Sequence, residues 1–247
     1  MRILGIDTAT PTASVALIED QKILAEQIHR QAKISSDQAA PPPKGNHAEV
    51  LVALIRSLLA GASLSLSQLS GIAVTIGPGS FTGLRIALAT VKGIAYEWGV
   101  PVVGVSTLHA NAVRVLDNGI ICSLLDARKQ EVYAALFRRA GKVFTRVSED
   151  AVLPVGRVSE LLSDCGAVNP FLVGDGASAY EIQLRKSFGD AMRFSTGDEF
   201  GSVAAQAALL ARQRFLAAAT DDIGALSPHY LRSSEAQSKR FIAALTC

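Results

Sequence analysis

A glycine-rich stretch that carries a serine and a threonine separates a strand-like segment from a helix-like one. It consists of Gly77, Pro78, Gly79, Ser80, Phe81, Thr82 and Gly83. Glycine permits close backbone approach, and the start of a helix attracts phosphate groups. The stretch nevertheless lacks the Gly-Lys-Ser/Thr of a P-loop, and its spacing is not Gly-x-Gly-x-x-Gly. We therefore favour a tight turn in which Ser80 or Thr82 caps the following helix.

Two carboxylates, Asp7 and Asp126, each end a predicted strand and are further candidates for chemistry. Such groups can orient a metal-bound nucleotide or a water molecule, but capping of the next turn is the more frequent role. Asp175 stands between two glycines and is expected to be a turn residue. Ser80 has no partner base in the sequence, and no Gly-x-Ser-x-Gly elbow occurs. We expect no catalytic residue among them.

The histidines and cysteines do not follow metal-binding spacings. No His-x-x-x-His or His-Glu-x-x-His pair occurs among His29, His47, His109 and His229. The three cysteines are odd in number and widely spaced: Cys122, Cys165 and Cys247. This usage is typical of reduced thiols in a cytoplasmic protein. We expect no metal, no other cofactor and no disulfide framework.

Composition excludes several classes of protein. The 247 residues are 49% hydrophobic, which is enough for a sizeable core in one large domain or two small ones. No apolar run approaches the roughly 20 residues of a membrane helix, and the chain opens on a strand-like segment rather than a signal peptide. The formal net charge of +2 is too small to imply a nucleic-acid partner by itself.

The order of predicted elements is strands and then helices, twice over. Three strands open the chain, and a second meander is expected at 120–126, 131–138 and 142–147. This weak repeat predicts an α/β protein of two similar units, residues 1–106 and 107–247. Residues 31–45 contain three consecutive prolines and are expected to form a loop.

Two helices of the first unit show apolar surface on more than one side. In the helix expected from Asn46, with Glu49 as capping-box partner, apolar residues spread over about 200° of arc. The helix at 84–98 has an apolar stripe and, opposite it, Ile86, Ala89, Gly93 and Tyr96. A second helix of the same chain or a partner chain could cover these faces. Both helices are expected to flank one sheet and to present a joint surface.

Several motifs together resemble the bacterial TsaB family, also called YeaZ. They occur in the family's order and cover nearly the whole chain: residues 3–10, 46–49, 77–85, 126–133, 173–177 and 228–232. The stretch at 77–85 is the most specific of them. Loop 31–45 is longer and richer in proline than the family usually shows.

The resemblance implies a two-lobed fold of the actin/Hsp70/sugar-kinase type. It also implies a role in forming threonylcarbamoyladenosine at position 37 of tRNAs that read ANN codons. In that system TsaC supplies threonylcarbamoyl-adenylate, TsaD carries the metal and transfers the group, and the ATPase TsaE joins them. TsaB is the non-catalytic partner of TsaD, so contact with tRNA would be indirect or through the complex.

The residues agree with a non-catalytic role. Nucleotide-binding members of this fold carry Asp-x-Gly-Thr and Asp-x-Gly-Gly in their two hairpins. Here Asp7 and Thr8 are followed by alanine, and Asp126 is followed by alanine and Arg128, so side chains replace the phosphate-loop glycines. We expect weak ATP binding or none. The alternatives are a stand-alone phosphotransferase or glycoprotease-like peptidase, and a plain homodimeric binding protein.

The resemblance also assigns the two helices to partner binding, with a homodimer through the same helices as an option for the isolated chain. The residues expected at this interface are Asn46, His47, Glu49, Val50, Leu51, Leu54, Arg85, Ile86, Ala89, Gly93 and Tyr96. Either Leu51→Glu or Ala89→Arg is expected to weaken assembly without unfolding the chain.

Overall fold

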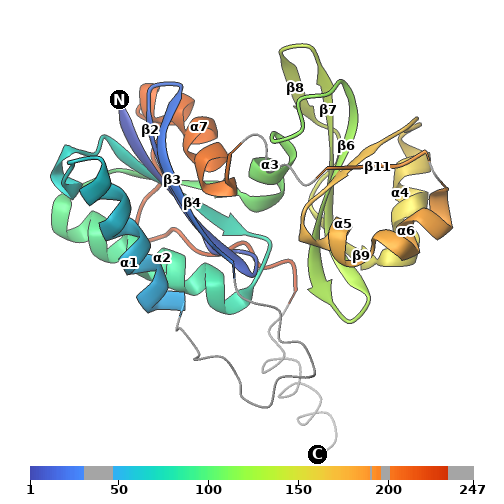
Figure 1. Cartoon of the computed structure of the whole chain (residues 1–247), viewed down its shortest axis with the longest axis horizontal. Helices are drawn as coiled ribbons and strands as arrows, with labels where there is room; N and C mark the ends of the chain where they lie inside the picture. The colour runs from blue at the N-terminus through green and yellow to red at the C-terminus, as the bar shows by residue number, and fades with distance from the viewer. Residues whose placement is uncertain (31–46, 190, 196–200, 233–247) are drawn as a thin grey trace, which may run out of the picture.

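A computed structural model describes residues 1–30, 47–189, 191–195 and 201–232, and the side chains from residue 49 onward in the second of these ranges. The chain forms two lobes, each built on a twisted sheet with helices packed against it (Figure 1). The predictions for Asn46 and for loop 31–45 lie outside the described residues.

The first sheet contains the three opening strands as a meander. These are β1 (Arg2–Asp7), β2 (Thr12–Glu19) and β3 (Lys22–Arg30), and β4 (Gly71–Gly77) and β5 (Val102–Ser106) complete the sheet. The strand order is β3-β2-β1-β4-β5, with β4 and β5 parallel to β1. Strands β1, β2 and β4 are buried almost throughout, because helices cover both faces of the sheet.

The second sheet repeats this arrangement. Its strands are β6 (Gly119–Arg128), β7 (Glu131–Ala140), β8 (Val143–Arg146), β10 (Phe171–Val173) and β11 (Arg193–Ser195), in the order β11-β10-β6-β7-β8. A short strand, β9 (Ala151–Pro154), also pairs with β7. Antiparallel and parallel pairings match those of the first sheet position by position. The predicted duplicated fold of the actin/Hsp70/sugar-kinase type is confirmed.

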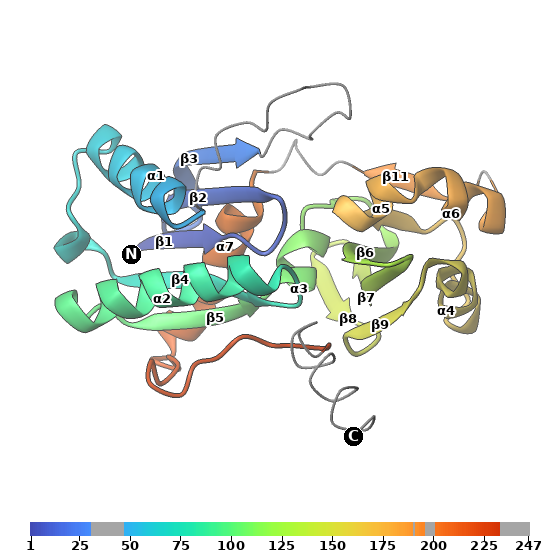
Figure 2. The ribbon, with the colours of Figure 1, turned by 90° about the horizontal axis from the view of Figure 1, so that it is seen from below.

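Helices α1 (His47–Gly61) and α2 (Phe81–Trp98) lie side by side on one face of the first sheet (Figures 1 and 2). Helix α2 begins three residues before the predicted start, because the Ser80 side chain accepts a hydrogen bond from the Gly83 backbone nitrogen and caps the helix at Phe81. The joint placement of both helices on one sheet is as predicted.

The remaining helices cover the second sheet and the space between the lobes. Helix α3 (Thr107–Ala112) packs between the two sheets. The second sheet carries α4 (Val158–Asp164), α5 (Asp175–Ala179) and α6 (Glu181–Phe188). Single 3-10 turns occur at Leu66–Gln68 and Val155–Arg157. No helix in the described part of the chain is long and apolar enough to span a membrane.

Helix α7 (Val203–Leu216) returns to the first lobe and covers the face of the first sheet opposite α1 and α2. Its alanines permit close approach: a Cβ added at Gly5 would overlap the Ala204 carbonyl oxygen. A domain boundary at residue 106 therefore separates α7 from the sheet that it covers, since α7 lies within residues 107–247. We keep the boundary near 106 as a proposal and add that α7 completes the first lobe.

Candidate functional site

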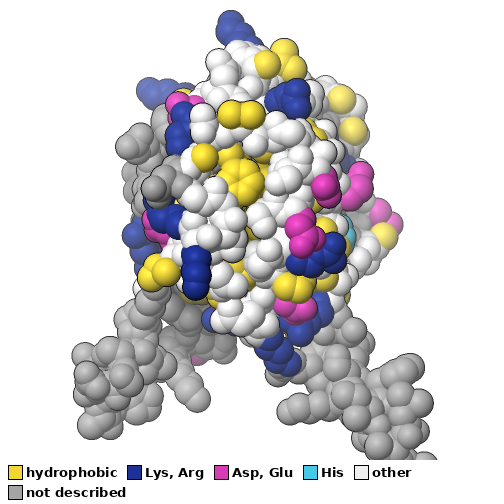
Figure 3. Space-filling model, turned by 90° about the vertical axis from the view of Figure 1, so that its right-hand side faces the viewer, with side chains coloured by type: hydrophobic (Ala, Val, Ile, Leu, Met, Phe, Trp, Pro, Cys, Tyr) yellow, Lys and Arg dark blue, Asp and Glu magenta, His cyan; other side chains and the backbone are white. Residues whose placement is uncertain are grey.

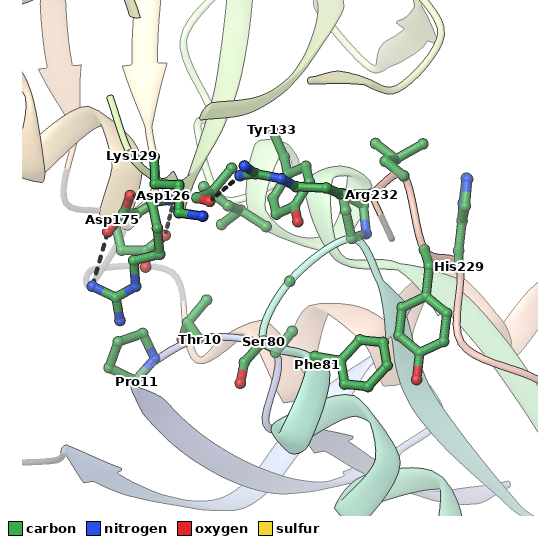
Figure 4. A pocket seen from close by; sticks show the side chains of 18 residues that line it. Thr10, Pro11, Ser80, Phe81, Asp126, Lys129, Tyr133, Asp175, His229 and Arg232 are labelled. Atoms are coloured by element: carbon green, nitrogen blue, oxygen red, sulfur yellow. Dashed lines mark hydrogen bonds and ion pairs between the residues drawn. The ribbon is translucent and has the colours of Figure 1, made fainter. Parts of the chain in front are cut away.

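A cleft of about 320 Å³ lies between the lobes, at the ends of strands from both sheets. Its volume is at the lower end of the range for small-molecule pockets. Figure 4 shows Thr10, Ser80 and Phe81 on the side of the first lobe, and Asp126, Lys129 and Tyr133 facing them from the second. The full lining consists of residues 9–11, 78–81, 125–129, 133, 175 and 229–232.

The glycines of the predicted turn contact the chain itself. A Cβ added at Gly83 would overlap the Thr8 carbonyl oxygen, and one added at Gly79 would overlap the carbonyl of Ala9. The Ser80 nitrogen donates to the Ala9 carbonyl at 2.6 Å, and the Thr8 hydroxyl donates to the Gly83 carbonyl at 2.7 Å. The close backbone approach that glycine allows is therefore used to seat the first hairpin, as the preference for a structural turn predicted.

Asp7 is enclosed behind this contact and does not line the cleft. Its carboxylate accepts hydrogen bonds from the Thr75 hydroxyl at 2.6 Å and from the Ala9 nitrogen at 3.2 Å. Burial raises the pKa of Asp7 to about 6, against the lowering effect of these bonds. The carboxylate thus serves the turn that follows it, which is the role the sequence favoured.

The corresponding hairpin of the second lobe lines the cleft directly. Asp126 accepts hydrogen bonds from the Arg128 nitrogen at 2.8 Å and from the Tyr180 hydroxyl at 3.0 Å, and it pairs with the Arg128 guanidinium at 3.2 Å. Arg128, Lys129 and Gln130 form the turn with positive φ angles of 66°, 56° and 62°. Two cationic side chains therefore stand at the mouth of the cleft.

Asp175 differs from its prediction as a turn residue, since it is the first residue of α5. Its carboxylate accepts from the Asp126 backbone nitrogen at 3.3 Å, and so joins α5 to the hairpin. Burial raises the pKa of Asp175 to about 6, with the nearby Asp126 charge acting in the same direction. The two glycines beside it pack against the β6 backbone, which explains their presence without a turn.

The C-terminal strap, residues 226–232, crosses the cleft and contacts both lobes. The His229 nitrogen donates to the Ile76 carbonyl at 2.6 Å, and the Tyr230 ring stacks on Phe81 with centroids 4.4 Å apart. At the far end, Arg232 donates to the Ala127 carbonyl at 3.1 Å and pairs with Glu131 at 2.8 Å. Sequence reasoning counted residues 228–232 among the family motifs but gave them no structural role. The available signal was the presence of Tyr230 and Arg232, which can stack and form ion pairs.

The strap also connects the cleft to the predicted partner helix. Arg85, the fifth residue of α2, donates to the Tyr230 hydroxyl at 3.0 Å, and its guanidinium lies 3.9 Å from the Phe81 ring centroid. Arg85 was predicted at the partner interface. In the structure its side chain is exposed, but it also contacts the strap. It thus joins the helix, the glycine-rich turn and the strap.

The predicted partner surface divides into an exposed and a buried part. Tyr96 is 90% exposed, and a Cβ added at Gly93 would meet no atom within 4 Å. The other exposed members are Glu49, Arg85 and Ala89, and the half-buried ones are Val50, Leu54 and Ile86. Asn46 is outside the described residues, and His47 is the first residue of α1.

Leu51 does not belong to this surface. Its side chain is fully buried in the core of the first lobe, so Leu51→Glu would place a carboxylate in apolar surroundings and unfold the lobe. Helix α2 packs against α1 and covers one of its apolar sides, as one of the two alternatives held. Val52, at 40% exposure, remains open on the other side.

The histidines lie apart from one another. His109 packs in a ring stack with Phe137 and Phe144, and His229 faces Asp150 at 3.8 Å. Within the described ranges, no three His, Cys, Asp or Glu side chains are grouped so that they could hold a metal ion. Cys122 is buried and Cys165 is partly buried, both as free thiols.

Comparison with known proteins agrees with the motifs. A family model described as TsaD, tRNA N6-adenosine threonylcarbamoyltransferase, matches residues 22–239. The chain is 31% identical to the tRNA threonylcarbamoyladenosine biosynthesis protein TsaB of Escherichia coli K12, over 97% of this chain and 98% of that protein. The TsaB protein of Bacillus subtilis 168 is 29% identical over 97% of both chains.

A solved structure, YeaZ from Pseudomonas aeruginosa, superposes with a TM-score of 0.70 at 26% identity, over 93% of this chain and 99% of that one. The agreement extends over both lobes, so it includes the cleft as well as the two helices of the first lobe. On the sequence identity, the coverage and the fold together, the chain belongs to the TsaB (YeaZ) family.

Proposed function

We propose that this chain is a non-catalytic, partner-binding subunit of the system that forms threonylcarbamoyladenosine in tRNA. The names of its relatives support the pathway, and the match to the TsaD family supports a partner of the same fold. In this proposal the chain binds a TsaD homologue through α1 and α2, and a TsaE homologue through that complex. The isolated chain would use the same helices to form a homodimer.

The observation that carries the proposal is the outward side of α2. Leu84, Leu88 and Val91 are buried against the sheet, whereas Ala89, Gly93 and Tyr96 lie in solvent along the opposite side. Small residues on a helix surface let another helix approach closely, and an exposed tyrosine is a frequent interface anchor. A helix that shows these residues outward fits a protein partner better than solvent.

The non-catalytic part of the proposal is supported by the cleft. Gly79 and Gly83 are taken up by contacts with the first hairpin, and the second hairpin presents Arg128 and Lys129 where phosphate-binding relatives have glycine. A side chain at such a position keeps a phosphate away from the backbone nitrogens. We therefore expect the isolated chain to bind ATP weakly or not at all.

Reconstitution tests the proposal. TsaC, TsaD and TsaE homologues are combined with ATP, threonine, bicarbonate and unmodified tRNA, with and without this chain, and modified adenosine is quantified. We expect product only when the chain is present. Equal product without it would contradict the subunit role.

The surface is tested in the same assay with Ala89→Arg, which adds a large cation to the outward side of α2. The matched control is Gln183→Arg, which adds the same charge to an exposed position of α6 in the second lobe. Ala89→Arg should abolish co-purification with the TsaD homologue and reduce product, while circular dichroism stays unchanged. Loss of binding in both variants, or in neither, would count against this face.

A further inference from the structure

The second lobe places basic side chains at the mouth of the cleft, on a turn whose backbone conformation is strained. Arg128, Lys129 and Gln130 all have positive φ angles, which asparagine and glycine adopt with less strain. The Arg128 side chain is 75% exposed, and Lys129 is exposed as well. Retained backbone strain at a cleft is a reason to look for a function of the side chains it displays.

The acidic side chains near this turn already have hydrogen-bond or ion-pair partners in the chain itself. Asp126 accepts from the Tyr180 hydroxyl and pairs with Arg128, and Glu131 pairs with Arg232 from the strap. Asp175 lies beneath the turn and accepts from the Asp126 nitrogen. Arg128 and Lys129 are both exposed at the mouth of the cleft, so an anion from solvent can reach them.

The opposite wall offers aromatic rings. Phe81 stacks on Tyr230 at 4.4 Å, and the Arg85 guanidinium lies 3.9 Å from the Phe81 centroid. Tyr230 remains 38% exposed, and its hydroxyl is held by Arg85 at 3.0 Å. A base that stacked on Tyr230 would extend the existing stack of Phe81 and Tyr230, in which the tyrosine ring is already held in one orientation. Tyr133 contributes a further ring to the lining.

We propose that the mouth of this cleft contacts single-stranded RNA. Exposed cations beside stacked aromatic rings are the features by which proteins hold unpaired nucleotides, through phosphate contacts and base stacking. A cleft of about 320 Å³ has room for an unpaired base and excludes a duplex. The inference rests on the proposed function in one respect, because that function would make tRNA the RNA that this chain contacts.

Another basic surface does not compete with this one. The outer end of the second lobe, around α4 and α6, shows Lys and Arg side chains interspersed with Asp and Glu (Figure 3). Pairs such as Arg157 with Glu160 and Arg185 with Glu181 account for part of this mixture. The rings at that end are covered by the chain's own arginines, since Arg185 lies over Phe194 at 4.4 Å and Arg193 over the buried Phe171 at 3.7 Å. Among the described residues, no ring–ring stack occurs there, so that end offers no comparable RNA surface.

The test is fluorescence anisotropy of the isolated full chain with a labelled oligouridine of about 12 nucleotides, from about 50 to 200 mM salt. Lys129→Glu is compared with Lys142→Glu, an equal charge change on an exposed lysine of the β7–β8 turn. Tyr230→Leu is compared with Tyr230→Phe, which keeps the ring. Circular dichroism melts confirm that each variant is folded.

We expect Lys129→Glu to lower the salt slope of log K by about 0.7 and Lys142→Glu to leave it unchanged. Tyr230→Leu should weaken binding about tenfold, and Tyr230→Phe should not. Equal effects of the two lysine variants, equal binding of a duplex of the same length, displacement by ATP, or no saturable binding would each overturn the proposal. The reconstitution above can succeed without RNA binding to this chain, so the two failures are distinguishable.

Discussion

The two hairpins at the cleft occupy equivalent places in the duplicated fold and have opposite uses. In the first, Asp7 is 1% exposed and its turn holds the glycine-rich stretch through Thr8 and Ala9. In the second, Asp126 lines the cleft and the turn presents Arg128 and Lys129 to solvent. The aspartate of the first hairpin is internal, although residues 9–11 reach the cleft, whereas the second hairpin presents its aspartate and two cations there.

This difference shows that equivalent hairpins of one duplicated fold can be held by different contacts. The first hairpin is fixed by contacts with a helix start about 75 residues away in sequence, which close the space beside it. The second hairpin is joined to α5 through the Asp175 carboxylate, and Arg128 and Lys129 stand there in place of glycine. Substitutions in each hairpin and its contacts can disturb the two separately.

The contact of the first hairpin with α2 is tested by Gly83→Ala. Because Gly83 has no positive φ, alanine suits its backbone, but its Cβ would overlap the Thr8 carbonyl oxygen. We expect a loss of about 3 kcal/mol in the free energy of unfolding. The control is Gly93→Ala in the same helix, where the space is open and a gain of about 0.5–1 kcal/mol is expected. Urea denaturation compares the two, and equal effects would contradict the packing.

The pH dependence of stability reports on Asp7. Its pKa rises from 3.8 in the unfolded chain to about 6 in the fold, so the folded state binds more protons between these values. The contribution of Asp7 to stability is therefore greatest below about pH 4, falls as the pH rises to about 6, and then levels off. The loss is on the order of 3 kcal/mol.

Asp7→Asn keeps an oxygen acceptor for the Thr75 hydroxyl and removes the titrating group. Thermal melts from about pH 4 to 8 should show a flatter profile for this variant than for the unmodified chain. Asp175, whose pKa is also raised to about 6, contributes in the same direction, so Asp175→Asn should further reduce the pH dependence of stability. A profile unchanged by Asp7→Asn would show that the buried carboxylate does not titrate in this range.

The strap is tested by Arg232→Ala, which removes the pair with Glu131 and the hydrogen bond to the Ala127 carbonyl. Both partners are partly exposed, so the expected cost is about 1 kcal/mol or less. Hydrogen exchange should accelerate at the second hairpin, residues 126–131, and remain unchanged at the first, residues 7–12. Faster exchange at both would mean that the strap supports the whole cleft rather than one wall.

The smallest effect is expected from Ala9→Gly. This change restores glycine in the first hairpin, but Gly79 still packs against residue 9 and the second hairpin keeps Arg128. Isothermal titration should find ATP binding no tighter in the variant than in the original chain. Sub-micromolar ATP binding by either protein would contradict the loss of the nucleotide site.

The sequence predicted what depends on local pattern. Alternation, caps and turn residues predicted both meanders, two helices on one sheet, and a glycine turn capped by Ser80 or Thr82, of which the structure shows Ser80. It missed what depends on partners far along the chain. The inward face of Leu51, the return of α7 and the role of Arg232 each follow from contacts with other elements. Asp175 was misassigned because its flanking glycines serve packing against β6 rather than a turn.

The return of α7 to the first sheet also constrains how the protein emerges from the ribosome. Ile3, Ile18, Ala73 and Val103 line the sheet face that α7 covers, and they are synthesised long before it. About a hundred residues separate the end of β5 from the end of α7, which corresponds to several seconds of translation. During that interval the apolar face of the first sheet lacks the helix that covers it in the folded chain.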